Sequence, residues 1–264
     1  MKKAEALFGY LKDRTVPSDA YLYTAMLGAT KAVDRTMTVL EEQLVRLGKL
    51  IPIFVTEYDG IFFADRAIEP PAATNRRNAT LACALFNASV LNIMARHERV
   101  LGAHHMSLAG SRFGSLVGVE GDVYFGNPQF YVHREYAREA GHLVVASTLD
   151  PQTATFDSGP MKLLAGQSRV PMLDVLATRE AGSRSFALFV VNRSLDTAVT
   201  ASVGLTLPSG VTGAMSVLNG PSYDSRNDAG NPIRVALTTA PFASTGPFTY
   251  QFAPHSLTIF RWTR

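Results

Sequence analysis

The sequence contains a single cysteine, Cys83, among its 264 residues. One cysteine cannot form a disulfide within the chain, and it cannot supply the thiolates of a cysteine-based zinc cage. The sequence also lacks any run of about 18 apolar residues, which is the length that a membrane-spanning helix needs. Neither a disulfide scaffold nor a membrane span is therefore predicted.

The first residues carry no recognisable secretion signal. Met1-Lys2-Lys3-Ala4-Glu5 is followed by neither an apolar stretch nor a small-residue cleavage site. Together with the single cysteine, this start favours a cytoplasmic location.

Charge is sparse and nearly balanced. Charged residues make up 18% of the chain, the formal net charge is +3, and Lys and Arg are scattered, which argues against a nucleic acid partner. Hydrophobic residues make up 47%, which is enough apolar material for real cores. The length fits one large domain or two ordinary ones.

Helical and strand patterns alternate in the first half of the chain. The long helix has apolar residues at steps of three and four, with Gly48 where it would stop. Asn127-Pro128 supplies a cap and a first-turn proline for the last helix, and Gly141 closes it. The order helix, strand, helix, strand, helix is predicted over residues 19–47, 51–58, 74–98, 100–106 and 127–141.

Beyond Gly141 the hydrophobic period changes to two. From Ala198 to Leu207, apolar residues alternate with small or polar ones, which predicts a strand with one face in a core. Seven or eight such strands, separated by turn-rich pieces, are typical of a β-sandwich. We expect Val199, Val203, Leu205, Leu257 and Ile259 to point inward. The other strands are expected at 172–178, 186–192, 215–218, 233–237, 248–252 and 257–262.

The two patterns predict a chain in two parts, residues 1–145 and 146–264. Two buried strands with their helices amount to about a quarter of an eight-stranded (β/α)8 barrel. Such a piece alone would leave strand edges and apolar faces uncovered. We therefore expect the C-terminal portion of a barrel followed by an antiparallel, jelly-roll-like β-sandwich. The missing barrel elements are expected upstream or on another chain, or the open faces are covered in a homo-oligomer.

Glu57 is the first candidate for chemistry. It ends the apolar run Ile51-Pro52-Ile53-Phe54-Val55-Thr56, which is typical of a strand buried on both faces. A parallel barrel strand delivers its last residues to the face where active sites are built. The alternative is that Glu57 merely opens a solvated loop.

The order of motifs along the chain resembles the C-terminal part of glycoside hydrolase family 51, the α-L-arabinofuranosidases. The resemblance spans nearly the whole chain, and no single motif carries it alone. The matching segments are Pro52-Ile53-Phe54-Val55-Thr56-Glu57-Tyr58, Ala95-Arg96-His97-Glu98-Arg99-Val100, Tyr131-Val132-His133-Arg134-Glu135-Tyr136, Val191-Asn192-Arg193-Ser194, Leu218-Asn219-Gly220-Pro221 with Asn227-Asp228, and Pro254-His255-Ser256-Leu257-Thr258.

This resemblance implies a retaining glycosidase that releases terminal α-L-arabinofuranosyl residues from polysaccharides or oligosaccharides, with no metal and no other cofactor. Glu57 matches the family's nucleophile on the seventh barrel strand. The acid/base carboxylate follows the fourth strand, upstream of this chain, and near Glu57 only Asp59 and Asp65 are acidic. We therefore expect the 264 residues alone to be inactive.

The chain departs from the family pattern beside the nucleophile and after the last barrel strand. Tyr58 replaces the usual Trp, and Thr56 replaces an Asp. Ser107 and Gly110 stand where the family places Gln and Asn near the sugar. The altered donors leave a xylosidase or β-glucanase specificity open.

Several residues are candidates for the sugar pocket. His104 and His105 end the second strand, and neighbours on a strand point to opposite faces, so one of them at most faces a sugar easily. Structural roles are the alternative for both, and a metal ligand is disfavoured because no carboxylates cluster with them. Tyr58 could stack on a sugar, hydrogen-bond the nucleophile or simply pack. Ser107 completes this candidate set.

Two further motifs have ordinary interpretations. Asn192-Arg193-Ser194 matches a glycosylation acceptor but is interpreted as a turn between strands, and the glycines at 110, 114, 118 and 121 as a loop rim. The rival to the enzyme hypothesis is a non-catalytic carbohydrate-binding or structural module in which the β-sandwich is the working part.

Overall fold

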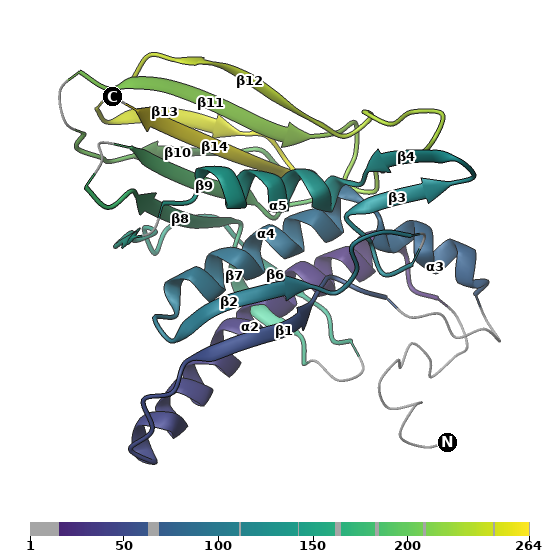
Figure 1. Ribbon diagram of the computed structural model, residues 1–264, viewed down its shortest axis with the longest axis horizontal. Coiled ribbons are helices and arrows are strands. Elements are labelled where there is room, and N and C mark those ends of the chain that lie inside the picture. The colour runs from purple at the N-terminus through teal and green to yellow at the C-terminus, as the bar shows by residue number, and fades with distance from the viewer. Residues whose placement is uncertain are drawn as a thin grey trace.

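The computed structural model describes residues 16–62, 69–110, 112–141, 143–161, 165–182, 185–207, 210–244 and 246–263. The described chain forms layers, with helices packed between a two-stranded parallel sheet and an antiparallel β-sandwich (Figure 1). The helices are α2 (Asp19–Arg46), α3 (Pro71–Asn78), α4 (Leu81–Arg96) and α5 (Pro128–Glu139). The parallel strands are β1 (Ile53–Tyr58) and β2 (Val100–His105).

Helix α2 begins and ends where the sequence predicts. The Ser18 hydroxyl accepts a hydrogen bond from the Tyr21 amide at 3.2 Å, which caps the N-terminus. Gly48, with φ of 63°, follows the last turn in the left-handed conformation that glycine adopts without strain. Only the first half of the helix, from Leu22 to Thr30, is buried.

The single helix predicted over residues 74–98 is wrong, because the chain breaks at Ala79–Thr80 into α3 and α4. The first amides of α4 cannot bond within the helix, and they donate to a distant loop instead. Leu81 N donates to Ser225 O at 2.8 Å and Ala82 N to Tyr223 O at 2.8 Å. These bonds fix the start of α4 against the β-sandwich side of the molecule.

Helix α4 is the centre of the fold. Every residue from Leu81 to Val90 is buried, and the helix contacts α2, α5 and the sheet strands behind it. In Figure 1, α4 and α5 lie between the sheet and the β1–β2 pair. No single described helix is long and apolar enough to cross a membrane, although the bent α3–α4 pair together reaches that length and composition.

The Glu57 strand is covered on one face only, as expected for a barrel piece taken alone. Val55 and Tyr58 of β1 pack against the helical core, but Phe54 on the other face is 53% exposed. The Phe54 ring lies over Gly102 of β2, where a Cβ would approach the ring to 2.6 Å. β1 pairs with β2 alone, so the described residues hold two parallel strands here and no closed barrel.

The predicted β-sandwich is confirmed. Its larger sheet has six antiparallel strands in the order β12-β11-β14-β9-β8-β5, and β10 pairs with β13 in the smaller one. The strands are β5 (Leu143–Val145), β8 (Leu173–Arg179), β9 (Phe186–Asn192), β10 (Val199–Val203), β11 (Thr212–Asn219), β12 (Ala236–Phe242), β13 (Phe248–Phe252) and β14 (Ser256–Thr263). β5 pairs with β8 at one edge of this sheet. The division of the chain after residue 145 stays a prediction.

Both faces of the six-stranded sheet are buried. Phe260 and Trp262 face β10–β13, where their rings stack at 5.9 Å between centroids and Trp262 Nε1 donates to Ser244 O at 2.8 Å. Leu257 and Ile259 alternate with them and belong to the core shared with α4. The expectation that these two residues fill the sandwich interior is therefore wrong, because the helices cover the other face of β14.

Two hairpins complete the described fold. One is β3 (Val117–Glu120) with β4 (Val123–Gly126), which follows the loop after β2. The other is β6 (Thr155–Ser158) with β7 (Gln167–Pro171), which packs on α2. The sequence patterns predicted neither hairpin.

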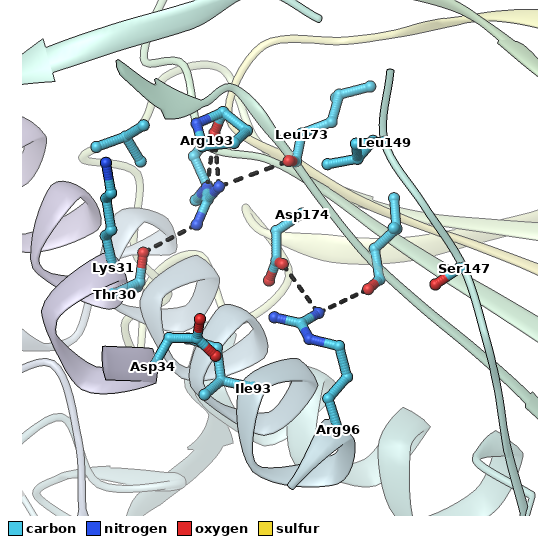
Figure 2. A pocket seen from close by; sticks show the side chains of 13 residues that line it. Thr30, Lys31, Asp34, Ile93, Arg96, Ser147, Leu149, Leu173, Asp174 and Arg193 are labelled. Atoms are coloured by element: carbon cyan, nitrogen blue, oxygen red, sulfur yellow. Dashed lines mark hydrogen bonds and ion pairs between the residues drawn. The ribbon is translucent and has the colours of Figure 1, made fainter. Parts of the chain in front are cut away.

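A cluster of charged side chains joins the helices to the sandwich around a cavity of about 240 Å³ (Figure 2). The Arg193 guanidinium donates to Thr30 Oγ1 at 2.9 Å and to Pro171 O at 2.6 Å. Asp174 accepts from Arg96 Nη1 and from Asn92 Nδ2, each at 3.1 Å. Asn192 thus ends β9, Arg193 and Ser194 lie in the predicted connection to the next strand, and Arg193 ties the end of β9 to α2 and β7.

Replacing Arg193 tests this junction. We expect Arg193→Ala to lower the free energy of unfolding by roughly 3 to 5 kcal/mol, because it leaves buried carbonyl oxygens without donors. Arg35→Ala, on the exposed part of α2, should change it by less than about 0.5 kcal/mol. Urea unfolding followed by circular dichroism measures both, and equal small effects would show that the junction contributes little.

Candidate active site at the carboxyl ends of β1 and β2

Glu57 lies on the open side of the parallel pair. The regular alternation of β1 breaks near its end, where Thr56 and Glu57 are both exposed and the register with β2 shifts between Val55 and Tyr58. A bulge of this kind bends a strand and redirects its side chains. The Glu57 carboxylate is therefore accessible at the end of the strand, which a nucleophile requires.

Tyr58 points to the opposite side, toward helix α5. Its hydroxyl lies 2.6 Å from His133 Nε2, and His133 Nδ1 lies 2.8 Å from Gln129 O. A carbonyl oxygen only accepts, so Nδ1 carries the hydrogen and Nε2 accepts from the Tyr58 hydroxyl. The proton of Tyr58 is thus committed to His133 and is not directed at Glu57.

Burial sets the ionisation of this pair. Desolvation by burial lowers the pKa of His133 to about 4, with the Gln129 carbonyl opposing the shift and His105 adding to it. Burial also raises the pKa of Tyr58 above its ordinary value, with a further contribution from Asp59. Both groups are therefore neutral near pH 7.

Asp59 and His105 form a second buried pair beside the first. Their side chains are 0% and 4% exposed, and Asp59 Oδ1 lies 3.4 Å from His105 Nε2. Asp59 Oδ1 also accepts from Gly60 N at 2.7 Å and from Asn87 Nδ2 at 3.0 Å. Burial raises the pKa of Asp59, while His105, Asn87 and Gly60 oppose the shift.

The two neighbouring histidines lie on different faces, as the strand geometry requires. His104 is exposed on the open side, with its ring 4.9 Å from that of Phe54. His105 packs edge-on against His133 at 4.7 Å between ring centroids. The structure therefore brings His104, and not His105, to the side where Glu57 is exposed.

Ser107 lies in the loop after β2, between the buried pair and the glycine-rich segment. Its amide donates to His105 Nδ1 at 3.2 Å, and its hydroxyl is 2.7 Å from that of Ser115. At Gly114 a Cβ would lie 2.4 Å from Asn78 O, so close packing explains why this position holds a glycine. Asp65 lies outside the described residues.

Sequence reasoning missed Asn87, and it named Asp59 and His133 without placing them in this site. One signal was present, because Asn87 is a lone amide in the middle of an apolar helix, and buried amides need partners. His133 appeared only as part of a motif. Among the described residues no three His, Cys, Asp or Glu side chains are grouped as a metal site would require.

The described chain thus combines a parallel strand pair, at whose end a carboxylate is exposed, with buried helices and a β-sandwich. Barrel enzymes build their active sites at the carboxyl ends of such strands. Residues 57–256 match the model of the α-L-arabinofuranosidase C-terminal domain. The chain belongs to this family, and its setting is that of family 51 glycoside hydrolases.

Solved structures agree with this assignment at the level of the fold. An α-L-arabinofuranosidase from Thermotoga maritima in complex with arabinose superimposes with a TM-score of 0.76 at 15% identity, covering 90% of this chain and 49% of that one. The family 51 enzyme from Xanthomonas axonopodis pv. citri gives 0.71 at 17% identity, covering 94% and 49%. AbfB from Bifidobacterium longum gives 0.58 at 23% identity, covering 69% and 34%.

The chain spans about half the length of the first two solved relatives. A search of curated protein sequences finds no match. The family assignment therefore rests on the domain model, and the solved relatives establish the fold.

The neutral state of His133 predicts an acid-sensitive fold. A histidine whose folded pKa is about 4, against about 6.5 unfolded, contributes stability above pH 6.5 that is lost as the pH falls toward 4. His133→Gln removes the titrating group and keeps an acceptor for Tyr58. Between pH 7 and pH 4 we expect the wild type to lose on the order of 2 to 3 kcal/mol more than the variant.

Thermal unfolding at a series of pH values measures this difference. His255→Gln is the matched control, because His255 lies between β13 and β14 and its Nδ1 donates to Leu195 O at 2.6 Å. Parallel pH profiles for the wild type and His133→Gln would contradict a neutral, buried His133.

Proposed function

We propose that this chain supplies the nucleophile, Glu57, and the last two barrel strands of a retaining α-L-arabinofuranosidase. The observation that carries the proposal is the exposed carboxylate of Glu57 at the carboxyl end of a parallel strand, inside the segment that matches the family model. In a retaining mechanism this carboxylate forms a covalent glycosyl ester, which water then hydrolyses. Terminal arabinofuranosyl groups of oligosaccharides or polysaccharides are the proposed substrates.

We expect the second carboxyl group of the reaction to come from outside the described residues. A retaining pair lies about 5 to 5.5 Å apart, with one member on each side of the scissile bond. Asp59 is the acidic residue next along the chain, and it is buried behind β1 on the helix side. It cannot reach a leaving oxygen on the side where Glu57 is exposed.

The open face of β1–β2 supports a barrel that is completed by further elements. Parallel sheets in proteins are covered on both faces, yet here only the helix face is covered. Phe54 of β1 is 53% exposed and Leu101 of β2 is 72% exposed. Apolar residues at the C-terminal end of α2, such as Val45, are exposed as well. The unmatched half of the solved relatives is long enough to supply the missing strands and helices.

Within this arrangement the open side would form the sugar pocket. His104 is placed to hydrogen-bond a sugar, with Phe54 fixing its ring from the side. Ser107 and Tyr58 support the pocket from behind, through His105 and His133 respectively. None of these residues needs a metal or cofactor for the proposed step.

Turnover of an aryl α-L-arabinofuranoside tests the proposal. The 264-residue chain alone should be inactive, and the barrel completed by in-frame upstream sequence or by a co-expressed second polypeptide should be active. In that active form Glu57→Gln should lower kcat by roughly a thousandfold or more. Glu98→Gln, an exposed glutamate at the opposite end of β2, should leave kcat within about threefold.

Product stereochemistry supplies an independent result. Proton NMR of the first-formed sugar should show the α anomer, because two displacements restore the configuration. Turnover by the 264-residue chain alone, full activity of Glu57→Gln or release of the inverted anomer would each contradict the proposal. Sugar binding without turnover in every form would instead favour the carbohydrate-binding module.

A further inference from the structure

A cavity lies at the junction of the helices and the sandwich (Figure 2), and we call it the junction cavity. Helices α2 and α4 form one wall, and β7, β8 and the segments that follow β5 and β9 form the rest. Its volume is about 240 Å³. A single water molecule needs only about 10 to 15 Å³ of such space, so the junction cavity has room for a small organic molecule.

Arg193 brings a buried positive charge to this cavity. It is 6% exposed, and its guanidinium donates only to neutral oxygens, which are Thr30 Oγ1, Pro171 O and Leu173 O. Within the part of the chain that the structure describes, Arg193 forms no ion pair. These contacts occupy four of the five N–H groups of the guanidinium, so one hydrogen of Nη1 is left for another acceptor.

Asp174 is the one buried carboxylate among the described residues that line the cavity, and Arg96 already engages it. Its Oδ1 accepts from Arg96 Nη1 and its Oδ2 from Asn92 Nδ2, each at 3.1 Å. Burial lowers the pKa of Arg193, a shift that Asp174 opposes and Arg96 reinforces. One buried carboxylate thus faces two guanidinium groups, whereas buried charges normally have partners of their own.

The rim of the junction cavity carries two charged residues of α2. Lys31 Nζ donates one of its three hydrogens to Ser168 O at 2.9 Å. Asp34 Oδ1 lies 3.3 Å from Nε2 of His97, the residue that ends α4. A single negative charge would balance the lining. Its charged residues are three cations, Lys31, Arg96 and Arg193, and two carboxylates, Asp34 and Asp174.

Apolar side chains form much of the remaining lining. Ile93 of α4 is buried, and Leu149, Pro171 and Val175 lie on the strand side. An inorganic anion has no carbon to place against these surfaces, whereas a hydrocarbon group gains free energy by leaving water there. Ligand sites commonly combine apolar walls with a few convergent polar groups and lie between structural units. The lining therefore fits an anion with a short carbon chain.

We propose that the junction cavity binds a small organic carboxylate. Its oxygens accept from Lys31 Nζ and from the remaining hydrogen of Arg193 Nη1, and its carbon chain packs on Leu149 and Pro171. Both cations form charge-assisted hydrogen bonds to a carboxylate, which also supplies the one negative charge that the lining lacks. Because its partners lie on α2 and on the strand side, the bound carboxylate stabilises the junction. No residue of β1 or β2 lines the cavity, so the inference does not depend on the role of Glu57.

Titration of the 15N-labelled 264-residue chain with sodium isobutyrate, followed by nuclear magnetic resonance, tests the proposal. We expect saturable shifts at the Lys31 and Leu149 amides and at Arg193 Nε, with a dissociation constant on the order of 1 mM. Isobutyramide has the same shape without the charge. It should bind at least about tenfold more weakly, because it loses the charge-assisted hydrogen bonds. Sodium chloride at the same ionic strength should give no saturable shift.

Two variants locate the ligand, and a third is the control. Lys31→Gln should raise the dissociation constant roughly two- to fivefold, as expected for an exposed charge pair. Leu149→Trp should abolish saturation, because the larger ring fills the apolar part of the cavity. Arg35→Gln changes an exposed cation of α2 outside the lining and should leave the constant unchanged. All three residues are at least partly exposed, so the variants should keep the circular dichroism spectrum of the wild type.

Three results would overturn the inference. The first is the absence of saturable shifts with isobutyrate in the wild type, which would mean that the junction cavity holds water alone. The second is equal affinity for isobutyrate and isobutyramide, or saturation that is unchanged in both Lys31→Gln and Leu149→Trp. The third is saturation by inorganic phosphate without saturation by isobutyrate, which would make the cavity a site for bare oxyanions.

Discussion

Helix α4 must be buried on every side, and the rest of the described structure follows from this constraint. Its apolar residues from Leu81 to Val90 are covered by α2, α5 and the six-stranded sheet. The sheet in turn is buried on both faces, since one face covers α4 and the other packs on β10–β13. Because the helix also contacts the segment after Glu57 through Asn87, the same packing that joins the two parts positions the candidate site.

One face of the β1–β2 pair carries buried, hydrogen-bonded side chains, and the other face carries exposed ones. On the helix side, Tyr58, His105 and His133 are buried and bonded, and they fix the strand ends. On the open side, Phe54, His104 and Glu57 have few neighbours. Side chains that line the interior of a barrel would have this pattern when the remaining strands are absent. The candidate nucleophile and the exposed apolar side chains thus lie on the same face of the pair.

Much of the fold was predictable because hydrophobic period is a local signal. The sequence predicted α2 and most sandwich strands from steps of 3.6 or 2 residues, α5 from its cap, first-turn proline and closing glycine, and β2 as a short apolar run. The break at Ala79–Thr80 was not predictable, because it depends on carbonyls from residues 223 and 225 that reach the start of α4. For the same reason the alternation of β14 did not reveal that Leu257 faces the helices. Glu57 stood out from its place after an apolar run, whereas Asp59 and His133 gain meaning only from contacts across elements.

The central claim is that Glu57 forms a covalent bond to the sugar once the barrel is complete. Peptide mass mapping of the completed enzyme, after treatment with an arabinofuranose-configured, mechanism-based inactivator, tests it most directly. The account predicts one added glycosyl group, carried by the peptide that contains Glu57, and no labelling of the Glu57→Gln variant. A label on any other carboxylate, or an enzyme that turns over substrate without ever being labelled, would contradict it.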